Sequence, residues 1–375
     1  MSEHVCRACR GATGEVVLDL GDQPASDYFP KRDDPGPDPV YPLQMWLCSS
    51  CGLAQLLADP TVPEEPRGAE PAALVEQAAE AVDRVGAAGW LRPGASAAEY
   101  GSPHGGSWMA LLEQRGLVNA EGGDQADVVL DCFGMMHRAD QATAMMERAA
   151  RVAPGGILLL QYHSLGTIMR RGQWNSLRHG HYAYYSARAI DRMLAAVGFT
   201  PRTAWQFDLY GGTVLLAATR DADSAPTPDQ TIRMLLTDED RLGVQDPESV
   251  RALQLTAEFN AKVFHSWLAA REATGAKVYG YGAASRAVSL LCRAEVNSRL
   301  LYAIADASRA KQGRRMPGTD IPVIGTDALV NGQPDAVLLF LPDLLSEVRN
   351  RIPEIEATGG RWIDVETLVS AEKNL

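Results

Sequence analysis

Several features that would place this chain in a broad class of protein are missing. No run of about 18 apolar residues occurs, so no membrane span is expected. The opening residues MSEHVCRACR lack the apolar stretch of a signal peptide, which predicts a cytoplasmic protein with reduced cysteines. Lysine and arginine number 35 against 47 acidic residues, giving a net charge of −12 with no basic cluster. Nucleic acid is therefore not an expected partner.

What the sequence does contain suggests an α/β protein of several domains. Its 375 residues are enough for two or three domains, and 46% of them are hydrophobic. We predict a cysteine-bearing module over 1–60, an α/β domain over 61–225, and a helical linker with a second α/β domain over 226–375. The proline-rich stretches TVPEEPRGAEP and DADSAPTPDQ mark the two boundaries.

Cysteine is scarce, and four of the six cysteines form two CxxC pairs. Two CxxC turns supply four thiolates to one ion, which suits a closed tetrahedral zinc site. The predicted ligands are Cys6, Cys9, Cys48 and Cys51. Four unrelated buried cysteines and a redox disulfide are the alternatives. A site saturated by thiolates predicts a structural role for the metal.

The run ASAAEYGSPHGGSWMALLEQRG reads as a strand, a glycine-rich turn and a helix. Such a turn lets a ligand approach the backbone at a helix N-terminus. The predicted cofactor-binding residues are Glu99, Gly101, Ser102, Gly105 and Gly106. The next strand, ADVVLDCF, follows after only VNAEGGDQ. A doubly wound domain normally places a strand, a helix and another strand there, so the central sheet is predicted to be truncated.

The stretch GQWNSLRHGHYAYYS gathers polar and aromatic side chains between two predicted elements. We interpret it as a ligand-facing loop, with a polar lid or interface segment as the alternative. Histidine titrates near neutral pH, so His181 and His137 are the preferred acid–base candidates. A metal at His179 and His181 is disfavoured because the two side chains do not share a helix face. The predicted substrate contacts here are Gln173, Trp174 and Asn175.

The second α/β unit opens with AKVYGYGAASRAVSLL, a strand, a glycine turn and a helix. Helix N-termini with small residues hold phosphate, and a serine and an arginine add contacts. The predicted contacts are Gly280, Gly282, Ser285 and Arg286. The loop KQGRRMPG, with Lys311 and Arg314, lies either over phosphate or in a solvated turn. The glycine pattern is incomplete for NAD, and a purely structural domain is the alternative.

The cysteine module, the central domain and the segment GYGAASRAVSLL…KQGRRMPGTDIPVIG together resemble bacterial C-methyltransferases that act on dTDP-4-keto-deoxysugars in antibiotic pathways. The resemblance covers nearly the whole chain. It implies a central class I methyltransferase-like domain that binds S-adenosylmethionine (SAM). It also implies a C-terminal Rossmann-like domain that helps to anchor a nucleotide-linked sugar.

In that family a histidine removes the proton beside the ketone, and the resulting enolate attacks the SAM methyl group. The resemblance assigns this base to His181 and a second conserved role to His137. His179, Arg178 and Tyr184 belong to the same run, although Arg178 stands in place of a tyrosine and Gly180 in place of a glutamate. The family's histidine-Gly-Gly motif is Tyr210-Gly211-Gly212 in this chain. The resemblance therefore implies that Tyr210 contacts the substrate.

The departures fall mainly on the cofactor side, where the Asn-Asp pair of the glycine loop is lost. Three functions therefore stay open. The first is SAM-dependent C-methylation of a nucleotide-linked keto sugar. The second is a relative that does without SAM and catalyses epimerisation, isomerisation or elimination. The third is a non-catalytic sugar-binding partner. The oligomeric state and the sugar itself are not predicted.

Overall fold

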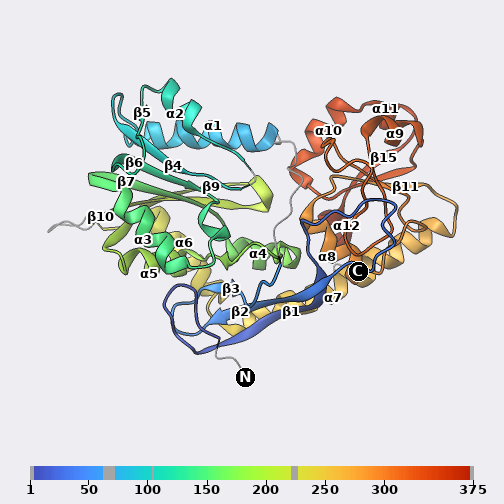
Figure 1. Ribbon diagram of the computed structural model, residues 1–375, viewed down its shortest axis with the longest axis horizontal. Helices are drawn as coiled ribbons and strands as arrows, with labels where there is room; N and C mark the ends of the chain where they lie inside the picture. Colours follow the sequence, from blue (N-terminus) through green and yellow to red (C-terminus); the bar gives the residue numbers. More distant parts are fainter. Residues whose placement is uncertain (1–3, 62–71, 104, 221–226, 372–375) are drawn as a thin grey trace.

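The computed structural model describes residues 4–61, 72–103, 105–220 and 227–371. Most of both predicted linkers, and His104 in the predicted glycine loop, lie outside these residues. In Figure 1 the central domain and the C-terminal domain stand side by side, and the cysteine-bearing module runs beneath both of them. Among the described helices, none has the length and apolar character needed to cross a membrane.

The N-terminal module is an antiparallel sheet with the strand order β1-β2-β3-β8. Its own strands are β1 (Gly14–Pro24), β2 (Val40–Cys48) and β3 (Ala54–Leu56). β1 and β2 are 11 and 9 residues long. The fourth strand, β8 (Ala183–Tyr184), comes from the central domain and pairs with β3. The module is thus joined by backbone hydrogen bonds to the histidine-rich segment.

The central domain has a six-stranded sheet of order β5-β4-β6-β7-β10-β9. The strands are β4 (Ser96–Tyr100), β5 (Val118–Asn119), β6 (Ala126–Cys132), β7 (Val152–His163), β9 (Phe199–Phe207) and β10 (Thr213–Arg220). The first four are parallel, whereas β10 runs antiparallel to both β7 and β9.

Helices cover both faces of this sheet, which confirms the predicted doubly wound class. On β6, Val128 and Leu130 pack with α1 (Ala72–Ala87) and α2 (Met109–Gln114). Val129, which points the other way, packs with α3 (Gln141–Arg151) and α5 (Ala187–Ala195). Alternate residues of a strand face opposite sides, so a central strand covered on both faces is apolar throughout.

The predicted truncation is present, but it is not complete. Residues 118–119, for which no strand was predicted, form β5 and pair with Ser96 and Ala97 at the beginning of β4. The chain then turns back toward β6, and Arg151 holds this turn by donating to the carbonyls of Ala120 and Gly122. One edge of the sheet therefore ends in a two-residue strand, without the further strand and helix of an ordinary domain.

The C-terminal domain is a five-stranded parallel sheet of order β13-β12-β11-β14-β15. Its strands are β11 (Val278–Tyr281), β12 (Ile304–Ala305), β13 (Val323–Ile324), β14 (Ala336–Leu339) and β15 (Arg361–Asp364). Its helices are α8 (Ser285–Arg293), α9 (Thr326–Asn331), α10 (Leu345–Arg351), α11 (Glu354–Ala357) and α12 (Val365–Ala371). In chain order this is 3-2-1-4-5, the order of a Rossmann-like sheet, as predicted.

Two linker helices connect the domains. They are α6 (Gln230–Leu242) and α7 (Pro247–Glu272). Asp229 and Asp246 cap them by accepting hydrogen bonds from the backbone three residues on, and Pro247 occupies the first turn of α7. The 26-residue α7 lies along β1 and against α8, so it fastens the N-terminal module to the C-terminal domain.

Candidate functional site

A cavity of about 280 Å³ lies between the central and C-terminal domains. In each sheet the strand order reverses at one point, between β4 and β6 and between β11 and β14. Ligands of doubly wound folds bind outside the carboxyl ends of strands at such points. The two crevices face each other here, and loops after all four of these strands line the one cavity. A single ligand could therefore contact both domains.

His137 and His181, the two acid–base candidates from the sequence, meet in this cavity. Their ring centroids are 4.6 Å apart and the rings are nearly perpendicular. His137 Nδ1 lies 3.0 Å from the carbonyl oxygen of Gly180. Because a carbonyl only accepts, Nδ1 of His137 carries the proton, which leaves its Nε2 as the acceptor in the neutral ring.

A buried ion pair positions the turn that carries His137. Arg148 Nε donates to Asp131 Oδ2 at 2.8 Å, and both side chains are 2% exposed. Asp131 Oδ1 also accepts from the backbone of Met135, the first residue of the 3₁₀ turn η1 (Met135–His137). Burial raises the pKa of Asp131, which the charge and hydrogen bond of Arg148 oppose. The carboxyl group thus fixes both the end of β6 and the start of the histidine turn.

The N-terminal module holds the segment that carries His181. Asp59 accepts from the backbone N–H of Gly180 at 2.6 Å, and the backbone of Leu56 donates to the carbonyl of Tyr182 at 3.2 Å. Tyr182 in turn donates to the carbonyl of Met136 at 2.7 Å. The module and the His137 turn therefore grip the His181 segment from two sides.

Arg178 connects His181 to the C-terminal domain. Its Nε donates to His181 Nε2 at 2.9 Å, and its Nη1 donates to the hydroxyl of Ser285 at the start of α8. The backbone of Arg178 is fixed by Tyr184, whose hydroxyl accepts from the Arg178 N–H at 3.0 Å. Burial raises the pKa of Tyr184, which keeps the phenol neutral. All four side chains line the cavity.

A second polar chain crosses the domain boundary through His163. His163 Nε2 lies 3.2 Å from Gln173 Oε1, and Gln173 Nε2 donates to both carboxylate oxygens of Glu366. Glu366 also pairs with Arg286 at 3.6 Å. Burial, followed by the charge of Arg286, lowers the pKa of His163 to about 3. His163 is therefore neutral at physiological pH.

Two aromatic residues of the cavity adopt left-handed backbone conformations. Phe133 has φ 58° and Tyr210 has φ 54°, and their rings meet edge to face at 6.0 Å. Left-handed conformations are costly for bulky residues and concentrate at functional sites. The Tyr210 N–H donates to Asp343 at 3.0 Å, so the C-terminal domain supports this conformation. Both residues lie on the cavity wall.

On its other wall the cavity is lined by the turn after β11 and the start of α8. Gly282 has φ 85°, and Asp306 orders the turn by accepting from Ala283 at 2.8 Å. Four cationic side chains line the cavity, namely Arg178, Arg286, Lys311 and Arg351. This combination of a helix N-terminus with arginines and a lysine suits the phosphates of a nucleotide.

Not all predicted site residues reach the cavity. The predicted residues that line it are Ser102, Gly105, Gly106, His137, Arg178, His181, Tyr184, Tyr210, Gly282, Ser285, Arg286 and Lys311. The predicted residues outside its lining are Glu99, Gly101, Gln173, Trp174, Asn175, His179, Gly280 and Arg314.

The residues outside the lining have structural contacts that explain their positions. His179 bonds the carbonyl of Pro42 at 3.2 Å, so it faces the N-terminal module. Trp174 is buried in the core. Asn175 donates to the carbonyl of Arg286 and Gln173 to Glu366, so both join the domains. Gly280 lies inside β11, where a Cβ would collide with Phe340 and Ile304.

The KQGRRMPG loop is neither wholly over phosphate nor a solvated turn. Lys311 lines the cavity, but Arg314 Nη1 donates to the carbonyl of Phe29 at 2.6 Å. Arg315 is 6% exposed and binds Asp38 through two hydrogen bonds of 2.6 Å. The basic loop is therefore docked on the N-terminal module, which the sequence alone did not indicate.

Sequence reasoning assigned no role to several cavity residues. Phe133, Met136, Trp108, Glu347 and Arg351 all line it. The apolar residues read as core, and α10 carries no motif that marks it as part of a site. His163 ends β7 and Asp306 directly follows β12, so a position at a strand end was the one signal that could have found them.

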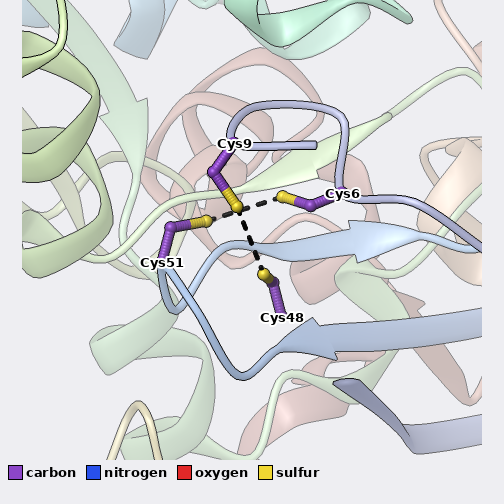
Figure 2. Close-up of side chains that lie close together, drawn as sticks. All are labelled: Cys6, Cys9, Cys48 and Cys51. Atoms are coloured by element: carbon purple, nitrogen blue, oxygen red, sulfur yellow. Dashed lines mark hydrogen bonds between the residues drawn. The ribbon is translucent and has the colours of Figure 1, made fainter. Parts of the chain in front are cut away.

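The four cysteines of the N-terminal module converge on one point (Figure 2). Cys6 and Cys51 sulfurs are 3.5 Å apart, those of Cys9 and Cys48 are 3.6 Å apart, and all four lie within 4.8 Å of one another. Zinc–sulfur bonds of about 2.3 Å in a tetrahedron place sulfurs roughly 3.8 Å apart. The four thiol groups therefore fit one zinc ion and leave no coordination position open.

Comparisons with known protein families agree with this three-part architecture. A putative zinc binding domain matches residues 6–65, a methyltransferase domain matches 115–204, and a C-methyltransferase C-terminal domain matches 208–365. The class is thus a SAM-dependent methyltransferase with an added zinc module. The chain belongs to the C-methyltransferase family that combines an N-terminal zinc-binding domain with this C-terminal domain.

A curated relative spans the whole length. The C-methyltransferase NovU of Streptomyces niveus is 22% identical, over 99% of this chain and 98% of that protein. Among solved structures, magnesium protoporphyrin IX methyltransferase from Synechocystis PCC 6803 is 12% identical over 40% of this chain and 84% of its own, with a TM-score of 0.31. The amino pentose methyltransferase CalS10 from Micromonospora echinaspora is 17% identical over 40% and 92%, with a TM-score of 0.25. These TM-scores are too low to add to the assignment.

The residues present fit one end of SAM better than the other. Ser102, Gly105 and Gly106 line the cavity, and both glycines have left-handed φ values that open the backbone to a ligand. Glu99 braces this loop by accepting from Ser107 at 2.5 Å and from the Trp108 N–H at 2.7 Å. This loop fits the amino-acid end of the cofactor.

Doubly wound domains that bind a nucleoside cofactor usually hold its ribose hydroxyls with an acidic side chain. Among the described residues of the central domain, no such side chain lines the cavity. The only carboxylates lining the cavity there are Asp306 and Glu347, and both belong to the C-terminal domain. Asp127, a candidate replacement, accepts from the backbone and hydroxyl of Ser96 where β4 begins, at the opposite end of the strand from the cavity. The ribose hydroxyls would therefore have to bind groups other than an acid after β5.

Proposed function

We propose that this protein C-methylates a nucleotide-linked keto sugar, with His181 as the base that removes the proton beside the ketone. The single observation that carries the proposal is the shared cavity. In it, two histidines lie between a glycine loop suited to SAM and a cationic turn suited to a diphosphate. A phosphate-bearing substrate such as a nucleotide-linked sugar is supported by the four cationic side chains that line the cavity.

The roles follow from the contacts. The sugar diphosphate binds at Ser285, Arg286 and Lys311, which leaves the sugar directed toward the histidines. His181 Nε2 takes the proton from the carbon beside the ketone. His137, whose Nδ1–H is held by the Gly180 carbonyl, faces the developing enolate oxygen with Nε2 and stabilises it when protonated. Bound SAM supplies an electrophilic methyl group to the carbanion.

Deuterium exchange tests the proton-transfer step by itself. The protein is incubated with a dTDP-4-keto-deoxysugar in D₂O, with and without SAM, and the sugar is analysed by mass spectrometry. We expect deuterium at the carbon beside the ketone without SAM, and a methyl group at that carbon with SAM. His181→Gln is expected to reduce both by roughly 10²–10⁴-fold. Unchanged exchange in this variant would show that another group is the base.

The incomplete nucleoside end favours a second candidate, a SAM-independent epimerase, isomerase or lyase on a similar substrate. Each unpaired buried ribose hydroxyl would cost about 1–3 kcal/mol of SAM binding. Calorimetric titration with SAM separates the two candidates. SAM binding supports methylation, whereas sugar exchange in a protein that shows no heat with SAM supports the second.

A further inference from the structure

The cavity contains a contact that holds the base in an unreactive state. Arg178 Nε approaches both ring nitrogens of His181, with Nε2 at 2.9 Å and Nδ1 at 3.4 Å, so Nε2 is the nearer acceptor. A guanidinium group only donates and stays protonated in proteins, so the accepting nitrogen must present its lone pair to it. That lone pair is the group which would take the proton from the substrate. While Arg178 occupies it, His181 cannot act as a base.

The same guanidinium reaches toward the predicted phosphate site. Its Nη1 donates to Ser285, the first residue of α8, and the cavity wall at this point also includes Arg286 and Lys311. Phosphate oxygens bind guanidinium more strongly than a neutral hydroxyl or imidazole does, because the contact is charge-assisted and bidentate. A diphosphate at α8 would therefore compete for Arg178.

The backbone of Arg178 is fixed while its side chain bridges two domains. Tyr184 bonds both the N–H and the carbonyl of Arg178, at 3.0 and 3.4 Å. A change of partner thus requires only rotation of the side chain. The backbone around His181 is held through Tyr182, Gly180 and the Arg178 carbonyl, so its place does not depend on the Arg178 side chain.

We propose that Arg178 is a positioning residue that couples phosphate binding to the release of His181. In the free protein it caps the lone pair of the base. When the diphosphate of the nucleotide-linked substrate binds at α8, the guanidinium turns to the phosphate and no longer donates to His181 Nε2. This inference rests on the proposed function for the identity of the substrate. It restricts proton abstraction to molecules that carry the diphosphate.

Histidine NMR tests the coupling without SAM or sugar. The protein is labelled with ¹⁵N-histidine, and the signals of His181 are assigned as those lost in His181→Gln. The probe is inorganic pyrophosphate. In the free protein we expect Nε2 of His181 to show the shift of a hydrogen-bonded acceptor and a lowered titration midpoint, since the like charge of Arg178 disfavours imidazolium. Pyrophosphate should raise this titration midpoint and change the Nε2 shift.

Two variants make the test specific. In Arg178→Gln the midpoint should be raised without pyrophosphate, and the further change on adding pyrophosphate should be smaller than in the parent protein. Arg188→Gln removes an arginine that pairs with Asp240 outside the cavity lining, so it should behave like the parent. Equal His181 midpoints in the parent and Arg178→Gln would overturn the proposal, as would a response to pyrophosphate that does not depend on Arg178.

The outcome is separable from that of the proposed function. If pyrophosphate leaves every histidine signal unchanged, the coupling is refuted, although deuterium exchange on a keto sugar can still succeed. If the coupling is observed but no sugar undergoes exchange, the regulation stands and the assigned chemistry fails.

Discussion

Replacing Asp38 by asparagine should destabilise the protein by about 3–5 kcal/mol, the usual cost of breaking a buried ion pair at one partner. Asp38 and Arg315 are 5% and 7% exposed at their side chains, and two hydrogen bonds of 2.6 Å join them. Asp38 also accepts from the N–H of Gly318 at 2.7 Å. Asparagine keeps the shape but removes the charge and one acceptor, so Arg315 stays buried without its counter-ion.

The pKa of Asp38 supports this reasoning. Burial by itself raises the pKa of Asp38, but the hydrogen bonds from Arg315 and Gly318 outweigh burial and lower it. The folded state therefore favours the carboxylate. Its contribution to stability is present above about pH 4 and is lost as the pH falls through the lowered pKa.

The assay is guanidinium unfolding followed by fluorescence, with thermal unfolding as a second probe. For a chain of this length unfolding in one transition, the expected loss corresponds to a fall in Tm of roughly 4–6 °C. Glu15→Gln is the matched control. It breaks the pair with Arg251, which also joins the N-terminal module to the linker helix but is 39–54% exposed, and should cost at most about 1 kcal/mol.

A double variant removes the remaining ambiguity. Asp38→Leu combined with Arg315→Met replaces both charges by apolar groups, which should recover much of the lost stability because no unpaired charge is left. A loss below about 1 kcal/mol in Asp38→Asn, equal to that of the exposed control, would refute the argument. It would mean that Arg315 gains water or another partner when Asp38 is neutral.

Three further predictions follow from the site. Chelation of zinc, or Cys48→Ser, should reduce proton exchange on the sugar, because the N-terminal module holds the His181 segment through the hydrogen bond from Gly180 to Asp59. Exchange at the parent rate in protein that metal analysis shows to lack zinc would contradict this. His181→Gln should reduce exchange by roughly 10²–10⁴-fold while leaving unchanged both the circular dichroism spectrum and the binding of dTDP measured by calorimetry. The pKa of His163 is about 3 in the folded protein, below its unfolded value. The free energy of unfolding should therefore fall as the pH drops below about 6.5, by up to about 1.4 kcal/mol per pH unit. His163→Gln should make this dependence shallower in acid unfolding curves.

The sequence predicted local chemistry better than long-range contacts. The cysteine spacing identified the four zinc ligands, because CxxC turns constrain their sulfurs locally. His137 was predicted near a ligand because it follows a strand of a doubly wound sheet, and His181 because it lies in a stretch dense in polar and aromatic residues. His179, two residues from His181, faces the opposite way, since Gly180 between them has a left-handed φ of 80° that no spacing rule shows. Arg315 likewise reads as a solvated residue until the module that buries it is in place.

The shortened edge of the central sheet and the Arg178–His181 contact both concern how the residues of the cavity are held in place. Among the described residues of the central domain no carboxylate lines the cavity, so that domain offers the cofactor fewer polar contacts through which to order the site. In this chain, organisation comes from the other side: Gln173 reaches Glu366, the Tyr210 N–H reaches Asp343, and Arg178 reaches Ser285, each across the domain boundary. The C-terminal domain therefore supports the conformations of residues that face the reaction. On this reasoning substrate binding, rather than cofactor binding, is the event that completes the catalytic arrangement.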